Sequence, residues 1–317
     1  MRRSVVGVAV GVVLVGVLSS AGGSSASGGV DATALPAGEI VFSQTADAFR
    51  DLPSSVYVMS LEGSHVRLLA KNASEPAVSR NGRQIAFLRD GAIWVMRRDG
   101  SAKRQVIKPK TAASDLAWSA DGTTIYFTTD GLFAIRSDGT HLRELRPQKY
   151  VERTADPAPS PDGRIIVYTV VPDDPPLVHL TSLHAVTPAG RPARLPFRLP
   201  AVGNGGPEDA AWAPNGQRIA YSVHDDMDSG DLGATGIYVA SKGSSPPRRI
   251  VSGTKIAGFP VAPWDPAWST DGAWIACMVQ SSSNNYDIWL VRPNGTGFRQ
   301  ITKTKADEDS PAWLPPA

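Results

Sequence analysis

The sequence predicts an all-β fold, a six-bladed β-propeller with four antiparallel strands in each blade. Two observations predict it: an internal repeat, and the alternation of β-prone segments with tight turns. Propeller blades recur every ~40–50 residues, and the aligned alanines of this repeat are separated by 40, 41, 53, 56 and 45 residues. The six alanines are Ala77, Ala117, Ala158, Ala211, Ala267 and Ala312.

Each repeat predicts four strands joined by short turns. The clearest unit, DPAWSTDGAWIACM, begins at Asp265, and its Ala-Trp-Ser segment is the expected first strand. The turn at Asp271-Gly272 follows, because Asp-Gly and Asn-Gly pairs adopt the positive φ angles that tight antiparallel turns need. Residues 275–278 and 288–291 are the second and third strands, and Asn294-Gly295 leads to the outer strand. No stretch from 30 to 317 has sustained helical spacing of apolar residues, so helices should be scarce.

The two ends of the repeat region predict how the ring closes. Residues 39–70 supply second, third and fourth strands without a first strand, whereas residues 310–314 are a first strand without the rest of a blade. Pairing residues 310–314 with the 40–43 segment completes the sixth blade and removes two exposed sheet edges. A five-bladed ring with frayed ends is the alternative.

The repeats resemble the WD40-like repeats of the TolB-type propellers. That consensus runs Pro-Ala-Trp-Ser-Pro-Asp-Gly, Ile-Ala-Phe, Ile-Tyr-Val-Met, Asp-Gly and Arg-Gln-Leu-Thr, and residues 265–302 follow it almost throughout. The resemblance covers residues 39–317. It implies a freestanding extracytoplasmic propeller, a group associated mainly with binding and scaffolding. Related propellers accompany α/β-hydrolase domains, but the sequence contains no G-x-S-x-G nucleophile elbow.

The first 29 residues predict an export signal. Arg2 and Arg3 precede an uncharged apolar run over residues 5–18, and small residues follow it. A run of this length is short of the ~20 residues that span a bilayer, so membrane contact is expected only if the signal stays uncleaved. Residues 30–38 are a short linker and residues 39–317 the propeller. We therefore expect an exported protein that is periplasmic, or else extracellular or associated with the cell wall.

Composition narrows the class of partner. The chain has 32 basic and 30 acidic residues, and without Arg2 and Arg3 the two signs balance. A nucleic-acid-binding protein should show a basic excess gathered on one face, so no nucleic-acid partner is expected. Cys277 is the only cysteine and lies in an apolar run, so it should be a buried core residue rather than a nucleophile. We expect a monomer.

The order of strands predicts two different faces. The first-to-second and third-to-fourth turns share one face, called here the turn face. The second-to-third loops and the connections between blades share the other, called the long-loop face. Variable loops carry specificity because they change without disturbing the scaffold, so this second face is the expected binding face. Its irregular segments are 44–55, 171–177, 200–208, 223–236, 252–264 and 280–286.

Acidic residues recur at the start of the first strands on this face. First strands line the channel of a propeller, so these side chains should surround the channel mouth. Carboxylates gathered there are hard oxygen ligands for a cation such as Ca²⁺, or attract a basic group of a partner. Alternatively, each accepts backbone hydrogen bonds and shapes its own connection. The predicted residues are Glu75, Asp115, Asp156, Asp209, Asp265 and, beside Ser310, Asp309.

Two further groups are candidates on the long-loop face. The segment from His224 to Asp231 is the densest acidic cluster, and its Asp-x-Asp-x-Gly spacing is similar to the start of a calcium loop. Its candidate calcium ligands are Asp225, Asp226, Asp228 and Asp231; the alternative is a solvated loop. Aromatic side chains are the other group, as stacking surface on the rim: Phe49, Phe259, Trp264 and Tyr286.

The leading functional hypothesis is a propeller scaffold that binds a protein or peptide partner of the cell envelope on its long-loop face. One alternative is a channel-mouth enzyme, such as a propeller lyase, a lactonase or a glycan-active hydrolase. Such an enzyme should converge histidine, acid and metal ligands on the channel, and His224 is the only histidine expected on that face. The other alternative is a carbohydrate-binding module of the cell envelope. No residue is assigned a catalytic role.

Overall fold

A computed structural model of the chain describes residues 35, 37–46, 53–147, 152–172, 180–199, 205–224, 234–243, 246–256, 259–261, 263–280 and 285–316. The chain divides into a unit of residues 1–34, which lies outside this range, and a unit of residues 35–317. The second unit is the propeller. All regular elements in the described residues are β-strands, and no helix there is long and apolar enough to cross a bilayer.

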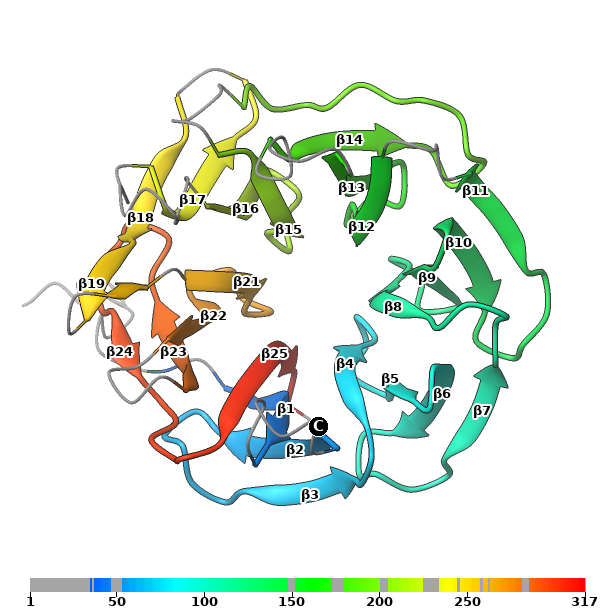
Figure 1. Cartoon of the computed structure of the whole chain (residues 1–317), viewed down its shortest axis with the longest axis horizontal. Coiled ribbons are helices and arrows are strands. Elements are labelled where there is room, and N and C mark those ends of the chain that lie inside the picture. The colour runs from blue at the N-terminus through cyan, green and yellow to red at the C-terminus, as the bar shows by residue number, and fades with distance from the viewer. Residues whose placement is uncertain are drawn as a thin grey trace, which may run out of the picture. The chain divides into compact units, whose positions relative to one another are not determined.

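Six antiparallel sheets surround a central opening (Figure 1). Blade 1 contains β25 (Asp307–Leu314), β1 (Glu39–Thr45), β2 (Ser55–Ser60) and β3 (Arg67–Ala70). Blade 2 contains β4 (Ser74–Val78), β5 (Gln84–Arg89), β6 (Ala92–Arg97) and β7 (Arg104–Ile107). Blade 3 contains β8 (Ser114–Trp118), β9 (Thr124–Thr128), β10 (Gly131–Arg136) and β11 (Arg143–Pro147).

The second half of the ring is less regular. Blade 4 contains β12 (Glu152–Pro159), β13 (Ile166–Pro172) and β14 (Ser182–Val186). Blade 5 contains β15 (Pro207–Trp212), β16 (Arg218–Val223), β17 (Gly236–Ser241) and β18 (Arg248–Ser252). Blade 6 contains β21 (Pro263–Trp268), β22 (Ile275–Gln280), β23 (Tyr286–Val291) and β24 (Arg299–Gln300). A separate hairpin of β19 (Thr254–Ile256) and β20 (Phe259–Val261) precedes blade 6, where the sequence predicted only an irregular connection.

The outer strand of blade 4 is reduced to a single bridge. Val186 pairs with Pro192, and the amide of Ala193 donates a 2.9 Å hydrogen bond to the carbonyl of Ala185. Pro188, Pro192 and Pro196 interrupt this segment. Because proline has no amide hydrogen to donate, a continuous ladder cannot form here.

The predicted closure of the ring is confirmed. β25 pairs antiparallel with β1 from the pair Glu39–Leu314 to the pair Thr45–Asp307. The C-terminal strand therefore becomes the innermost strand of the blade that opens the chain, as β25 beside β1 in Figure 1 shows. No five-bladed ring with frayed ends is formed.

The recurring tryptophans join neighbouring blades. The indole Nε1 of Trp212 and that of Trp268 each donate a 3.0 Å hydrogen bond to the carbonyl of the aligned alanine in the preceding blade, Ala158 and Ala211. Trp118 and Trp313 make the same contact with Ala77 and Ala267. Each indole thus satisfies its one donor while it packs between two sheets. Cys277 is fully buried in this core.

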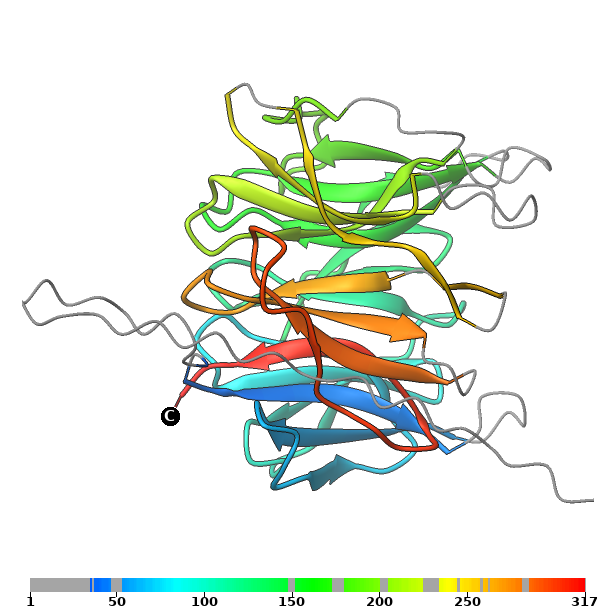
Figure 2. The ribbon, with the colours of Figure 1, turned by 90° about the vertical axis from the view of Figure 1, so that its left-hand side faces the viewer.

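The strand ends lie as the topology requires. In each blade the second strand ends, and the third begins, on the face where the first strand begins. The connections between second and third strands therefore all leave the sheets on one face; these are the connections from β1 to β2, from β13 to β14, from β16 to β17 and from β22 to β23. Figure 2 shows the ring from the side, with the strands of each blade running between the two faces. The long-loop face and the turn face are therefore distinct surfaces.

Candidate functional site

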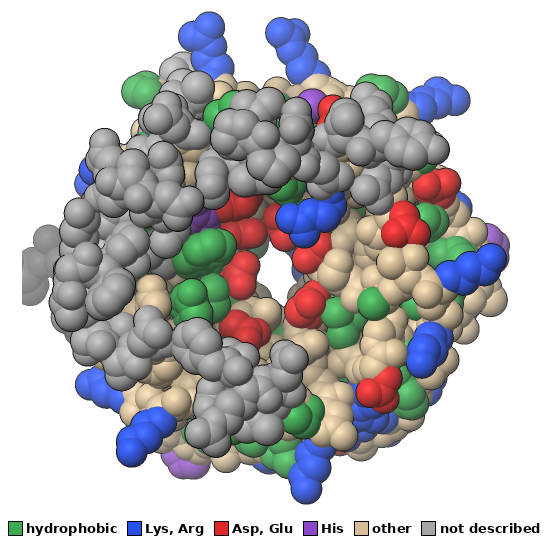
Figure 3. All heavy atoms as spheres, viewed as in Figure 1, with side chains coloured by type: hydrophobic (Ala, Val, Ile, Leu, Met, Phe, Trp, Pro, Cys, Tyr) green, Lys and Arg blue, Asp and Glu red, His purple; other side chains and the backbone are tan. Residues whose placement is uncertain are grey.

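A cavity of about 370 Å³ opens at the start of the first strands, at the centre of the ring. Five blades each contribute one carboxyl to its lining, and Ser310 of β25 takes the sixth position. We call this set the acidic ring: Glu75, Asp115, Asp156, Asp209 and Asp265. Figure 3 shows acidic side chains around the central opening and most basic ones at the periphery.

A repeated backbone feature points these carboxyls into the channel. Every ring position has a left-handed backbone, with φ between 48° and 54°, and Ser310 has a φ of 50°. Each lies in a β-bulge; in blade 2, for example, the register advances three residues from Ser74 to Ala77 while the partner strand advances two. Aspartate tolerates this conformation better than most residues, and a bulge redirects the side chain of its extra residue.

Hydrogen bonds between blades hold the ring in place. The amide of Asp115 donates to Glu75 Oε2 over 2.7 Å, and the amide of Asp265 donates to the Asp209 carboxyl. Neighbouring strands add hydroxyl donors, from Thr128 to Asp115 and from Ser222 to Asp209 at 2.9 Å. The carboxyls therefore do shape the connections between blades, which is the structural alternative that the repeat raised.

Two blades have no hydroxyl at this place. The residue equivalent to Thr128 and Ser222 is Leu88 in blade 2 and Met278 in blade 6, as the strand registers show. Neither side chain can donate a hydrogen bond. The carboxyls of Glu75 and Asp265 therefore face an apolar residue where their counterparts face a donor.

Burial and mutual repulsion raise the pKa of Glu75, Asp156, Asp209 and Asp265. Burial is the largest cause, followed by the charges of the other acids, and together they raise the pKa of Glu75 and of Asp265 to about 8. The same causes raise the pKa of Asp156 and of Asp209 well above its usual value. Water reaches these half-buried side chains through the channel, yet no lysine or arginine is among the described residues that line the cavity. The lining thus gathers carboxyl groups with no basic side chain among them, which favours their protonated forms.

The sixth position differs from the prediction in one detail. Ser310 lines the cavity, whereas Asp309, one residue earlier in β25, is not among the lining residues. Asp309 is hydrogen-bonded by Ser310 and Ser43, and burial raises its pKa to about 6. Its charge nevertheless contributes to the raised pKa of Glu75 and of Asp265, so Asp309 belongs to the electrostatics of the ring.

A histidine, a glutamate and a tryptophan pack together beside the ring. His224 Nδ1 contacts Glu208 Oε1, and the His224 imidazole stacks on Trp264 with ring centroids 3.7 Å apart. Glu208 and Trp264 each immediately precede a ring acid, Asp209 and Asp265. The sequence pointed to Trp264 as a rim aromatic but missed Glu208, whose only signal is its place beside a repeated acid.

The other predicted site residues are only partly described. Tyr286 is half-buried at the start of β23, where its amide donates a 2.9 Å hydrogen bond to Asp307 Oδ1. Phe49 and the four candidate calcium ligands, Asp225, Asp226, Asp228 and Asp231, lie outside the described residues, as does the side chain of Phe259. In the described part of the chain, no three His, Cys, Asp or Glu side chains converge closely enough to hold a metal ion.

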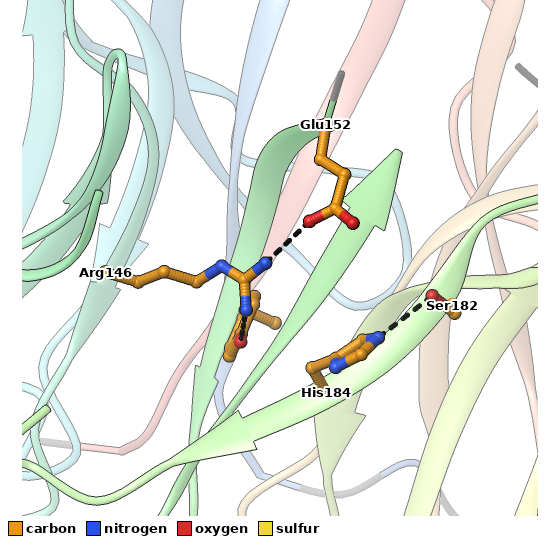
Figure 4. A network of polar contacts seen from close by, with 5 residues as sticks. Arg146, Glu152, Ser182 and His184 are labelled. Carbon is orange, nitrogen blue, oxygen red and sulfur yellow. Dashed lines mark hydrogen bonds and ion pairs between the residues drawn. The ribbon is translucent and has the colours of Figure 1, made fainter. Parts of the chain in front are cut away.

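A polar network that the sequence did not predict joins blades 3 and 4. Arg146 of β11 donates 2.7 Å hydrogen bonds to Tyr168 Oη and to Glu152 Oε2, and its guanidinium lies over the Tyr168 ring. Nearby, Ser182 Oγ and His184 Nε2 are 3.1 Å apart (Figure 4). This network connects the outer strand of blade 3 to the first strands of blade 4, so it contributes to the contact between blades.

Comparison with known proteins confirms the resemblance to TolB-type propellers. No family model matches the chain. Over 105 residues the chain is 30% identical to a protein TolB homolog of Chlorobium luteolum; the match covers 33% of this chain and 21%, about one fifth, of that protein.

Two solved TolB structures have the same fold. TolB from Acinetobacter baumannii superposes with a TM-score of 0.70 at 14% identity, over 88% of this chain and 67% of that one. A putative TolB from Agrobacterium tumefaciens superposes with a TM-score of 0.59 at 14% identity, over 84% of this chain and 89% of that one. At this identity the likeness shows the fold alone.

Proposed function

We propose that this chain is an exported propeller scaffold that binds a protein or peptide partner on its long-loop face. In this proposal the acidic ring receives a lysine or arginine side chain of the partner. The observation that carries it is the set of five carboxyls, from five blades, around one cavity whose described lining contains no basic residue. Export rests on the sequence of residues 1–29, and the likeness to TolB structures supports the scaffold.

The size and charge of the cavity favour a basic group. Ligand pockets span roughly 300–1,000 Å³, and this cavity of about 370 Å³ suits one long side chain rather than a folded domain. A cation in the ring stabilises ionised carboxylates, so binding lowers their pKa and releases protons. Affinity should therefore rise with pH through the range near 8 to which the pKa of Glu75 and of Asp265 is raised.

Binding of a labelled lysine-rich peptide, measured by fluorescence anisotropy at low salt, tests this proposal. We expect the variant Asp156→Asn with Asp209→Asn to bind at least about tenfold more weakly, since an ionic hydrogen bond contributes ~1.5–3 kcal/mol. The matched control, Asp121→Asn with Asp162→Asn, removes the same charge from the turn face and should bind normally. Wild-type binding should be stronger at pH 8 than at pH 5, and an acidic peptide of equal length should not bind.

The same proteins serve to capture a natural partner from a cell-envelope extract. A third variant, with the segment from Val223 to Gly236 shortened, tests whether that loop contributes to the rim. Peptide affinity that is equal in the ring variant and the control, or independent of pH, would contradict a role for the acidic ring. Equal recovery of every envelope protein by the shortened variant would remove the case for the loop.

Calcium is the cation that we propose for the segment containing Asp225, Asp226, Asp228 and Asp231, because carboxylate oxygens are the ligands it prefers. A ligand at 100 times its dissociation constant stabilises the folded state by ~2.7 kcal/mol, which raises the melting temperature of a domain of this size by roughly 5–10 °C. We expect millimolar calcium to produce such a shift relative to chelator. Asp226→Asn with Asp228→Asn should abolish it, and an unchanged wild-type melting temperature would refute a tight site.

A further inference from the structure

The turn face of blade 2 carries a cavity of about 570 Å³ that is lined by four arginines. Arg83 immediately precedes β5, and Arg104 is the first residue of β7. Arg97 is the last residue of β6, and Arg98 follows it. These segments meet because β5, β6 and β7 are neighbours in one sheet, with Gln84 paired to Arg97 and Val95 paired to Arg104. The cavity lies on the face opposite the acidic ring, so the two sites are independent.

Within the described residues, one of the four arginines has an ion-pair partner, and the lining contains one carboxylate. Arg98 donates a 3.0 Å hydrogen bond to the carbonyl of Pro315 and lies 3.8 Å from Glu39, so it is held in place. The single carboxylate in the lining is that of Asp99, which accepts a 2.9 Å hydrogen bond from the amide of Ser101.

The three remaining arginines are exposed, and within the described part of the chain none of them forms an ion pair. These are Arg83, Arg97 and Arg104. Three guanidinium groups around one cavity, against a single carboxylate, leave a net positive site.

Blade 2 differs from the other blades in the combination of its four arginines. Each blade places an arginine near the start of its outer segment: Arg67, Arg104, Arg143, Arg194, Arg248 and Arg299. The other three positions have a basic residue in some blades only: Arg83 corresponds to Arg164 in blade 4, Arg97 to Arg136 in blade 3, and Arg98 to Lys242 in blade 5. Only blade 2 has an arginine at all four positions, and because the blade fold does not require this set, the combination favours a role in binding.

We propose that this cavity is an anion site that binds the phosphate group of a phosphorylated ligand. Guanidinium groups present paired donors that match phosphate oxygens, and several of them together can neutralise a dianion. Because the arginines are exposed, salt should weaken the interaction. The phosphate could belong to a soluble phosphorylated molecule or to a phospholipid headgroup, and the two sources share this chemistry.

The test uses two probes, glycerol 3-phosphate in calorimetry and vesicles of phosphatidylglycerol in sedimentation, with phosphatidylcholine vesicles for comparison, all at low ionic strength. The site variant is Arg83→Gln with Arg97→Gln and Arg104→Gln. The matched control, Arg164→Gln with Arg136→Gln and Arg143→Gln, removes the same charge from equivalent positions in blades 3 and 4. We expect the site variant, and not the control, to lose affinity by about tenfold or more, which corresponds to ~1.4 kcal/mol of binding free energy.

The probe that responds identifies the source of the phosphate. Binding of glycerol 3-phosphate without vesicle binding would assign the site to a soluble ligand, and binding of phosphatidylglycerol vesicles would assign it to a headgroup. The proposal is overturned if the wild type binds neither probe, or if both triple variants weaken binding equally, which would mean a general effect of charge. Melting curves of both variants establish that they remain folded, and peptide binding at the acidic ring should be unchanged in both.

Discussion

Removal of residues 307–317 should abolish cooperative folding of the propeller. This deletion takes away β25, which pairs with β1 along its length and supplies the buried side chains of Trp313 and Leu314. Truncating one buried aromatic residue typically costs ~3–5 kcal/mol, and the total stability of a domain is only ~5–15 kcal/mol. Loss of a whole inner strand, with the hydrogen bond from Trp313 to Ala267, should exceed that margin. Thermal unfolding followed by circular dichroism measures the effect.

A circular permutant is the matched control. The carbonyl of Leu314 lies against Gly38, where a Cβ would approach it to 2.8 Å, so a short glycine-rich linker can join the end of β25 to the start of β1. A chain that begins at residue 307, continues through the linker to residue 38 and ends at residue 306 keeps every strand pair. It should melt near the wild type. A deletion variant that melts cooperatively at the wild-type temperature would refute closure as a requirement.

Stability should fall as the pH rises from about 5 to about 8. The pKa of Glu75 and that of Asp265 are raised to about 8 by burial and repulsion, whereas both groups ionise near pH 4 in the unfolded chain. Between these values the folded state binds more protons than the unfolded state, so increasing pH favours unfolding. Glu75→Gln with Asp265→Asn removes both titrations and keeps hydrogen-bond acceptors in place.

This double variant should be more stable than the wild type at pH 8 and differ little at pH 5. One pKa unit corresponds to ~1.4 kcal/mol of unfolding free energy. Because water enters the channel, we expect less than the full pKa shift implies, namely ~2–4 kcal/mol of added stability. This corresponds to roughly 5–10 °C in melting temperature. Melting curves from pH 5 to 8.5 measure it.

Asp121→Asn is the control of opposite sign, because hydrogen bonds from Ser119 and Thr123 lower the pKa of Asp121. The stabilising effect of the ionised Asp121 carboxylate is present at neutral pH and is lost only in acid. An identical slope in wild type and double variant would contradict the raised pKa values.

Much of the fold could be predicted from local information. The informative patterns are short and repeat along the chain: the Asp-Gly and Asn-Gly turns, the β-prone segments, and the segments that contain the six aligned alanines. Even the closure was predictable, because a first strand at one end of the chain matches its absence at the other. Blade 4 has the same strand order as the other blades, but its outer strand is reduced to a bridge because prolines occupy the segment that would have formed that strand.

The candidate site was only partly predictable, because local patterns identify its residues but not their geometry. The recurrence of Glu75, Asp115, Asp156, Asp209 and Asp265 showed which residues to consider. It did not show their left-handed backbone, or the raised pKa of Glu75 and of Asp265. These properties exist only when strands from separate blades bring carboxyls around one channel.

By itself, the sequence determined the number of blades, the order of strands, the two faces and the identity of the acidic residues, because all of these follow from short patterns that repeat. Only the tertiary structure decided that Ser310 rather than Asp309 lines the channel, and that Glu208, His224 and Trp264 pack together. It also brought the arginines of blade 2 around one cavity. Such contacts join residues far apart in the chain, and their geometry depends on bulges and blade packing that no local pattern encodes.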